Sequence, residues 1–163
     1  MLDMDFDALA VGQAFKSRGR TITESDVATF AAMSGDMHPV HTDAEWASES
    51  EFGERIAHGM LVLSYALGQM SFDPEHVIAL RGVREVVFKR PVRLGDTLHV
   101  RGKVASLGVV DEDSGLAHLK IEIVNQSARI VCRGQLDVLW RRGDRVVAAR
   151  IEDTEPVLVG IPF

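Results

Sequence analysis

The sequence has little cysteine and no excess of basic charge. Cys132 is the single cysteine among 163 residues, so neither an intrachain disulfide nor a cysteine metal cluster can form. Lys and Arg number 18 against 24 Asp and Glu, which gives a formal net charge of −6. Nucleic acids and anionic membrane surfaces select for basic proteins, so we predict neither as the main partner.

Long apolar runs are also missing. The longest stretch without a formal charge is 56–72, which is shorter than the ~20 apolar residues of a membrane span. The first seven residues are acidic, unlike the basic start of a signal peptide. We therefore expect a cytoplasmic protein without a membrane segment. Hydrophobic residues make up 46% and charged residues 26%, a globular composition, and the length suits one domain.

The first half of the chain carries helix signals. Thr23 followed by Asp26 resembles a capping box, with Asp in the position of the usual Glu, and predicts a helix start. Gly35 stands where a left-handed residue would end that helix. A second short helix is expected from Thr42, with another capping box, and should stop before Gly53.

A third helix is predicted over 59–72. Its residues leave no charged stripe, and a helix that is apolar on every side is expected to be buried on every side. Ser64, Gly68 and Ser71 would form one small-residue face that another backbone can approach closely. Such a helix needs a surrounding layer.

The second half of the chain supplies that layer. Apolar and polar residues alternate in 97–104, 117–123 and 130–140, and turn residues separate these runs, as in antiparallel strands with one solvated face. Earlier strands are expected near 83–88 and 13–21. We predict a single α+β domain over 1–163, with a core of about 10–142, in which a curled antiparallel sheet surrounds the apolar helix. Residues 145–163 have no assignment.

A polar cluster lies between the first two predicted helices. Asp36, His38 and His41 fall within six residues around Pro39, and His58 precedes Gly59 at the start of the apolar helix. An acid–base pair can activate water, and the amides of a helix N-terminus favour developing negative charge. These residue types can also bind metals, but Pro39 disfavours a helical pair of ligands and no second cluster exists in the sequence, so we predict no metal.

These residues resemble a known family. Ser-Gly-Asp-Met-His-Pro-Val-His-Thr-Asp at 34–43 and Ile-Ala-His-Gly-Met-Leu at 56–61 resemble the signature of the MaoC-like, (R)-specific enoyl-CoA hydratases, which have a hotdog fold. The family motif is Asp-x-Asn-Pro-x-His, and a His-Gly-Met opens its central helix. The turn at 90–96 is also similar, and the resemblance covers roughly 10–142. His38 replaces the family's usual Asn, where it could alter substrate preference or proton traffic.

The resemblance implies a function and roles. Asp36 and His41 would be the catalytic pair, the Gly59 amide would bind the thioester oxygen, and Ser64 would hydrogen-bond near the aspartate. The implied reaction is reversible addition of water to a trans-2-enoyl-CoA, which gives the (R)-3-hydroxyacyl-CoA without a cofactor. Hotdog proteins pair edge to edge, so a homodimer or a dimer of dimers is expected, with sites near the interface.

Each candidate also has a purely structural interpretation. Asp36 could cap a turn, Ser64 could bond back to its own helix, and His58 could orient the chain entering the helix. His38 and His58 are therefore taken as supporting residues. Three basic side chains could hold a CoA phosphate or could be ordinary rim charges: Lys89, Arg90 and Arg93.

Three other functions remain open. The chain could be a dehydratase that acts on an acyl carrier protein or on a branched or dicarboxylic acyl-CoA. It could be a hotdog thioesterase, although the helix over 59–72 contains no Asp or Glu to act as its acid. It could also be a non-catalytic acyl-CoA-binding module, which the intact pair of Asp36 and His41 disfavours.

Overall fold

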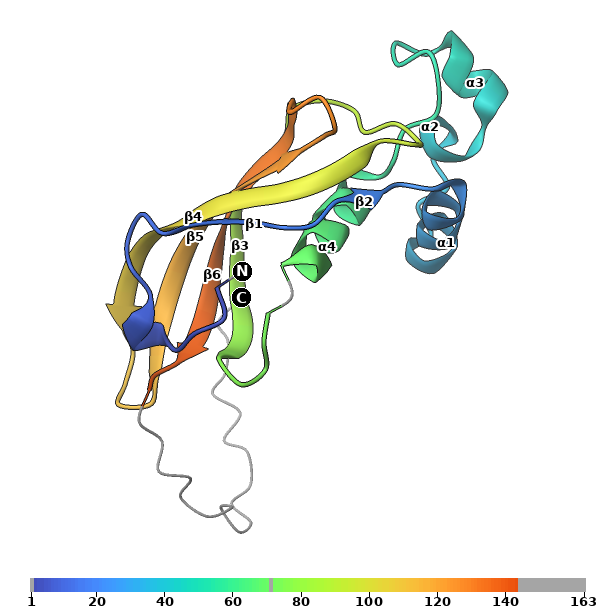
Figure 1. The fold of residues 1–163 in the computed structure, drawn as a ribbon. Coiled ribbons are helices and arrows are strands. Elements are labelled where there is room, and N and C mark those ends of the chain that lie inside the picture. Colours follow the sequence, from blue (N-terminus) through green and yellow to red (C-terminus); the bar gives the residue numbers. More distant parts are fainter. Residues whose placement is uncertain (1, 71, 144–163) are drawn as a thin grey trace, which may run out of the picture.

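The computed structural model describes residues 2–70 and 72–143 and shows a sheet with a few helices (Figure 1). The elements in chain order are η1 (Phe6–Ala8), β1 (Ala14–Lys16), β2 (Arg20–Thr21), α1 (Glu24–Ser34), α2 (Pro39–Thr42), α3 (Ala44–Glu49), α4 (Gly59–Gln69), β3 (Val77–Phe88), β4 (Thr97–Val109), β5 (Ser114–Val124) and β6 (Ile130–Arg141). Helices thus dominate the first half and strands the second, as the residue patterns predict.

The sheet is antiparallel throughout. Its strand order is β1-β4-β5-β6-β3, and β2 pairs with the first two residues of β4. Figure 1 shows the strands curving past α4, which lies on the inner side of the sheet, whereas α1, α2 and α3 gather at one end. The strand β3 therefore forms one edge of the sheet.

The core lies between the sheet and α4. The alternation expected along β4, β5 and β6 is confirmed, because one side of each strand is buried: Leu98, Val100, Val104, Ala117, Leu119, Ile121, Ile123, Cys132, Leu136, Val138 and Trp140. Four apolar residues of α4 pack into the same core: Leu61, Val62, Leu63 and Ala66. Burial of these apolar side chains away from water is the main stabilising contribution to such a fold.

The capping box at the start of α1 is confirmed. The Thr23 hydroxyl accepts a hydrogen bond from the Asp26 amide at 3.2 Å, and the Asp26 carboxylate accepts one from the Thr23 amide at 2.8 Å. Gly35 follows the helix with a φ of 77°, the left-handed conformation expected of a terminating glycine.

The region after α1 differs from the expectation. The predicted helix start at Thr42 is wrong, because Pro39–Thr42 is itself a helical turn and α3 follows from Ala44 with Asp43 as its cap. Proline suits the first position of a helix, since its φ is already helical and no donor is lost there. The predicted strand over 13–21 is also divided into β1 and β2, and α4 ends at Gln69.

The helix α4 is not buried on every side. Met60 is 56% exposed, and Ser64 and Gly68 are exposed on the same face, because the sheet covers only one side of the helix. The predicted small-residue face is therefore open in the single chain. Its third member, Ser71, and the unassigned residues 145–163 lie outside the described residues.

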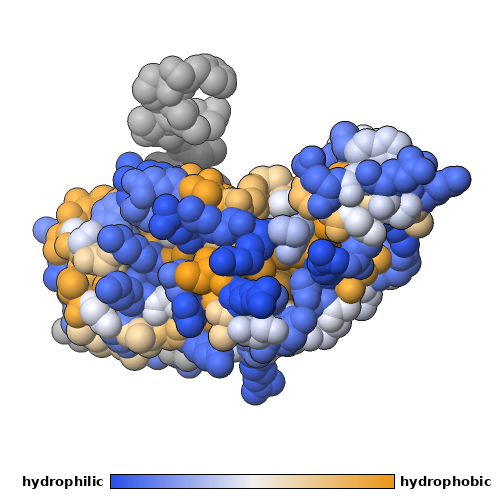
Figure 2. Space-filling view, turned by 90° about the horizontal axis from the view of Figure 1, so that it is seen from above, coloured by the Kyte–Doolittle hydropathy of each residue, from blue (hydrophilic) through white to orange (hydrophobic). Residues whose placement is uncertain are grey.

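A second open apolar surface runs along β3. Five of its large hydrophobic residues are exposed: Ile78, Leu80, Val83, Val87 and Phe88. The face seen from above mixes hydrophilic side chains with apolar patches between them (Figure 2). Within the described part of the chain, no helix combines the length and apolar character needed to cross a membrane.

Candidate active site

The aspartate of the polar cluster lies in the connection from α1 to α2. The Asp36 amide donates to Ser34 Oγ at 3.2 Å, and Asp36 Oδ1 accepts from the His38 amide at 3.2 Å. The turn-capping role considered for Asp36 is therefore real. It uses one carboxylate oxygen, and no described residue donates a hydrogen bond to the other. Asp36 is exposed and can meet a ligand with that second oxygen.

His41 lies in the last turn of α2 with a defined tautomer. Its Nδ1 lies 2.7 Å from the Ile56 carbonyl oxygen, and a carbonyl can only accept, so Nδ1 carries the proton. The lone pair of Nε2 is therefore free to take a proton. Burial lowers the pKa of His41, and the nearby His58 contributes in the same direction, so the ring favours its neutral form.

His58 connects the two candidate catalytic residues. It is buried, at 1% exposure, and its ring stacks on His41 with 3.8 Å between centroids. Its Nε2 donates to the Asp36 carbonyl oxygen at 3.0 Å. One carboxylate oxygen of Asp36 and one ring nitrogen each of His41 and His58 lie within 4.8 Å of one another. The fold thus brings together residues that are up to 22 positions apart.

The same three residues are of the types that bind metals. In this arrangement, however, His41 Nδ1 and His58 Nε2 each donate to a carbonyl, and His58 Nδ1 is buried without a hydrogen-bond partner. One ring nitrogen, His41 Nε2, is left with an accessible lone pair. The water-activating chemistry considered below requires no metal, and the absence of a metal remains a prediction.

The first residue of α4 provides a donor beside His41. Gly59 starts the helix, and no described residue accepts a hydrogen bond from its amide. The Phe88 ring lies directly on this glycine, since a Cβ added at position 59 would be 2.8 Å from Phe88 Cζ. The glycine therefore allows the close approach of β3 to the start of α4, where the helix dipole favours negative charge.

A pocket of about 360 Å³ opens beside these groups. His41 and Gly59 line it together with apolar side chains that include Phe52, Val62 and Phe88. Lys89 and Arg90 also line it. An apolar pocket with a few polar groups is the usual form of a small-molecule site.

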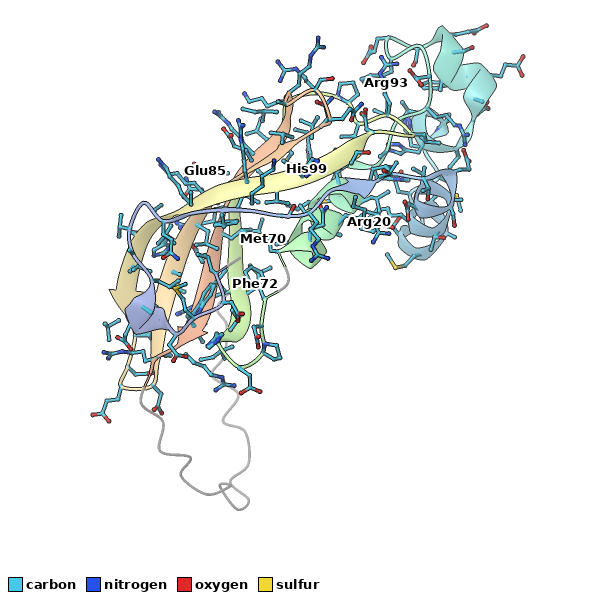
Figure 3. All side chains as sticks on the ribbon, in the orientation of Figure 1. Arg20, Met70, Phe72, Glu85, Arg93 and His99 are labelled. Atoms are coloured by element: carbon cyan, nitrogen blue, oxygen red, sulfur yellow. The ribbon has the colours of Figure 1, made fainter. Side chains whose placement is uncertain are left out.

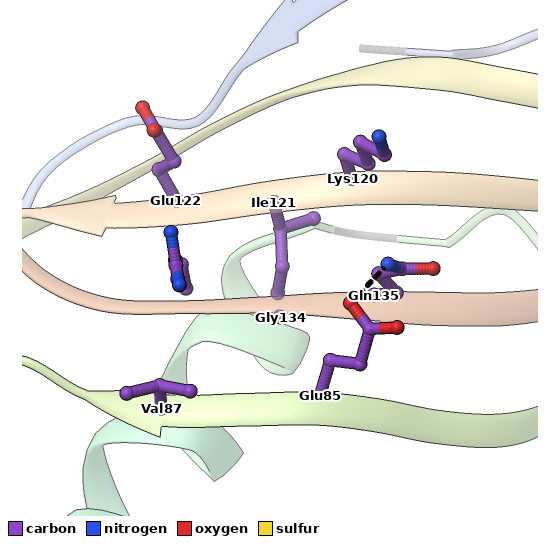
Figure 4. A pocket seen from close by; sticks show the side chains of 8 residues that line it. Glu85, Val87, Lys120, Ile121, Glu122, Gly134 and Gln135 are labelled. Atoms are coloured by element: carbon purple, nitrogen blue, oxygen red, sulfur yellow. Dashed lines mark hydrogen bonds between the residues drawn. The ribbon is translucent and has the colours of Figure 1, made fainter.

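A larger hollow, of about 590 Å³, lies on the outer face of the sheet. Figure 4 shows Lys120 and Glu122 of β5 and Glu85 of β3 around it, with the helix behind the strands. It contains none of the candidate catalytic residues. The smaller pocket, which His41 and Gly59 line, is therefore the candidate active site.

The three basic candidates for a CoA phosphate have different surroundings. Arg93 forms an ion pair with Glu54 at the end of the molecule that carries α2 and α3 (Figure 3). Arg90 donates to the Ile130 carbonyl at 2.6 Å, and Lys89 forms no side-chain bond to a described residue. Lys89 and Arg90 line the pocket, whereas Arg93 does not.

Ser64 is not brought to the catalytic pair by a hydrogen bond. It is exposed on α4, and its hydroxyl forms no hydrogen bond with a described residue, so the contact expected near Asp36 stays a prediction. Sequence reasoning missed the Ile56 carbonyl and the Phe88 ring. A backbone carbonyl is present at every residue, so the sequence cannot indicate which one binds His41. The contact with Phe88 was indicated only by the glycine at position 59, which leaves room for a ring.

Comparison with known proteins gives a family and a fold. The model of the MaoC like domain family matches residues 7–125. The (R)-specific enoyl-CoA hydratase of Rhodospirillum rubrum is 37% identical over 110 residues, which are 66% of this chain and 72% of that protein. Protein MaoC of Klebsiella aerogenes is 39% identical over 97 residues, 59% of this chain, but this match spans only 29% of the relative's length.

A solved structure agrees with the sequence relatives. The R-hydratase of Pseudomonas aeruginosa, solved without ligand, superposes with a TM-score of 0.71 and 29% identity, and the match covers 96% of each chain. The curled antiparallel sheet with α4 on its inner side is accordingly the hotdog fold expected from the sequence. Because the family model matches most of the residues that the structure describes, the chain belongs to the MaoC-like domain family.

Proposed function

We propose that the protein is an enoyl-thioester hydratase/dehydratase, a hydro-lyase that reversibly adds water to a trans-2-enoyl-CoA and gives the (R)-3-hydroxyacyl-CoA. The observation that carries the proposal is geometric. One carboxylate oxygen of Asp36 and one ring nitrogen of His41 lie within 4.8 Å of each other, and His41 shares a pocket with the free amide of Gly59. The name of the Rhodospirillum rubrum relative supports both the reaction and its stereochemistry.

The residues suit each step of the addition. Water held between Asp36 and His41 gives a proton to the pair, and its oxygen forms a bond to Cβ of the conjugated thioester. The double-bond electrons move toward the thioester oxygen, where the Gly59 amide and the N-terminus of α4 stabilise the enolate. The proton then returns to Cα, so the sum is one water added and the pair is restored.

The pocket beside Gly59 suits the arm of the thioester carrier. Its apolar wall can take the pantetheine chain, and Lys89 and Arg90 beside it can bind CoA phosphates. Arg93 is already paired with Glu54, which leaves it a smaller part in that role. None of the proposed reaction steps requires a cofactor.

We also propose that the protein forms a homodimer through β3 and the open face of α4. An edge strand of this length with exposed apolar residues is prone to pair with another chain. Ser64 and Gly68 on α4 are small enough to admit a second helix. Phe88 at the end of β3 lies on Gly59, so such an interface would border the proposed site.

Incubation with crotonyl-CoA tests the proposed function. We expect loss of the conjugated-enoyl absorbance and formation of (R)-3-hydroxybutyryl-CoA. Release of free CoA would instead indicate a thioesterase, although α4 carries no carboxylate within its observed bounds. Binding without turnover would indicate a non-catalytic module. Assays with the same acyl group on an acyl carrier protein, and with branched or dicarboxylic acyl-CoAs, distinguish the remaining substrate classes.

A further inference from the structure

His38 stands where the family motif has asparagine, immediately before α2. We propose that His38 is a positioning residue, whose Nδ1 acceptor holds the turn that carries His41. The proposal deepens the proposed function and rests on it for its activity test. It concerns how the catalytic pair is held, and it assigns His38 no contact with substrate.

The imidazole of His38 caps the start of α2. Its Nδ1 accepts a hydrogen bond from the Val40 amide at 3.2 Å. An amide can only donate, so Nδ1 holds a lone pair and the ring is neutral, with its proton on Nε2. A side-chain acceptor at this position satisfies a helix amide that would otherwise lack a partner.

The backbone of His38 binds both members of the catalytic pair. Its amide donates to Asp36 Oδ1 at 3.2 Å, and its carbonyl accepts from the His41 amide at 2.9 Å. The Thr42 hydroxyl also donates to this carbonyl, at 3.3 Å. The conformation at position 38 therefore sets where Asp36 and His41 lie relative to each other, and the side-chain cap fixes that conformation.

The hydrogen-bond acceptor, rather than the aromatic ring, explains how histidine can stand at the position where the family motif has asparagine. In both residues the acceptor atom is attached to Cγ, so Asn Oδ1 reaches the same amide as His Nδ1, and asparagine is among the strongest capping residues. The ring makes a second contact, edge-on to Trp46 with 5.5 Å between centroids. No hydrogen bond joins the rings of His38 and His41 in the described residues, so a direct proton relay between them has no support.

Three substitutions separate the acceptor from the ring. His38→Asn keeps the acceptor and removes the ring, His38→Phe keeps a ring against Trp46 without an acceptor, and His38→Ala removes both. We expect His38→Asn to hydrate crotonyl-CoA within about threefold of the unmodified kcat. The Phe and Ala variants should each lose about fivefold or more in kcat, with KM changed less than kcat, because a lost cap lets the turn leave its competent conformation.

Hydrogen exchange of the Val40 amide provides a readout that does not depend on activity. We expect its protection to be kept in His38→Asn and lost in His38→Phe. The proposal is overturned if the Asn variant is as impaired as the Ala variant, or if the Phe variant keeps full activity and protection. If the unmodified protein does not hydrate crotonyl-CoA, the proposed function fails, while the exchange measurement still decides whether His38 caps α2.

Discussion

At the scale of single residues, the proposed chemistry depends on the protonation of His41. The Ile56 carbonyl fixes the proton on Nδ1, and burial lowers the pKa of the ring below its usual value of 6.5. The partly buried position therefore keeps Nε2 unprotonated at neutral pH. A base in this state needs no further activation to accept a proton from water.

This lowered pKa predicts the pH dependence of hydration. In the proposed mechanism the reactive form of His41 is neutral, so activity should be constant from pH 8 to pH 7 and should fall on acidification at a lower pH than for an ordinary histidine, as the ring gains a proton. The measurement is kcat/KM for crotonyl-CoA from pH 5 to pH 8. A rate that still rises between pH 7 and pH 8 would mean that a group with an ordinary or raised pKa controls the reaction.

At the scale of elements, the N-terminus of α4 is the proposed oxyanion donor. Gly59→Pro removes the amide hydrogen and should lower kcat by about 10²–10³. Proline fits the first helical position, and His58 already has a ψ of 137°, the extended conformation that precedes proline. The backbone should therefore tolerate the change.

Gly59→Ala is the matched control for this prediction. Both substitutions add a Cβ that meets the Phe88 ring, which is exposed enough to move, but only proline removes the donor. Turnover and thermal unfolding of both variants give the measurement. Equal activity of two equally folded variants would place the oxyanion donor elsewhere.

The helices α1 and α4 are linked by a polar contact that the sequence did not reveal. The Tyr65 hydroxyl on α4 donates to Asp26 at 2.5 Å, and the Arg20 guanidinium lies over the Tyr65 ring. Burial acts to raise the pKa of Asp26, but hydrogen bonds from Tyr65 and Thr23 outweigh it and lower the pKa to about 2. The carboxylate is therefore more favourable in the folded than in the unfolded chain.

We expect Asp26→Asn to lower the free energy of unfolding at pH 7 by about 1–2 kcal/mol. Because the folded pKa lies below the unfolded one, this contribution is present above pH 4 and disappears as the pH falls toward 2. Chemical denaturation of both proteins at several pH values measures it. A difference in stability that is the same at pH 7 and pH 2.5 would contradict the ionic origin.

Some of these elements could be predicted because their causes are local. The capping box at Thr23 involves residues three apart, and the alternation in β4 to β6 has a period of two, so both are visible in the sequence. The turn at Pro39 is only four residues long and gives no periodic signal. The contacts of His41 with Ile56 and His58 depend on how segments meet after folding.

The exposure of α4 shows another limit. An all-apolar sequence predicts contact with other residues, but it does not say whether they belong to the same chain. In the single chain one face of α4 stays open, beginning with Met60. The homodimer proposed above would cover this face and would account for the apolar pattern on that side of the helix.

At the scale of the whole molecule, β3 and α4 are the surfaces expected to pair. A double substitution on β3, Leu80→Lys with Val83→Lys, places two charges on the proposed interface. Sedimentation at micromolar concentration should show a dimer for the unmodified protein and a monomer for this variant. Val109→Lys is the control, because it changes an exposed apolar residue of β4 away from that interface. A monomeric, fully active unmodified protein would contradict the proposed assembly.

The central claim is that Asp36 and His41 together activate water, and conservative variants that keep their local hydrogen bonds test it most directly. Asp36→Asn keeps an acceptor for the His38 amide, and His41→Asn can still donate to the Ile56 carbonyl, so the local structure should survive both changes. The measurement is kcat for hydration of saturating crotonyl-CoA. We predict a loss of about 10²-fold or more for each variant with unfolding temperatures near that of the unmodified protein. Near-normal turnover in both variants would contradict the account.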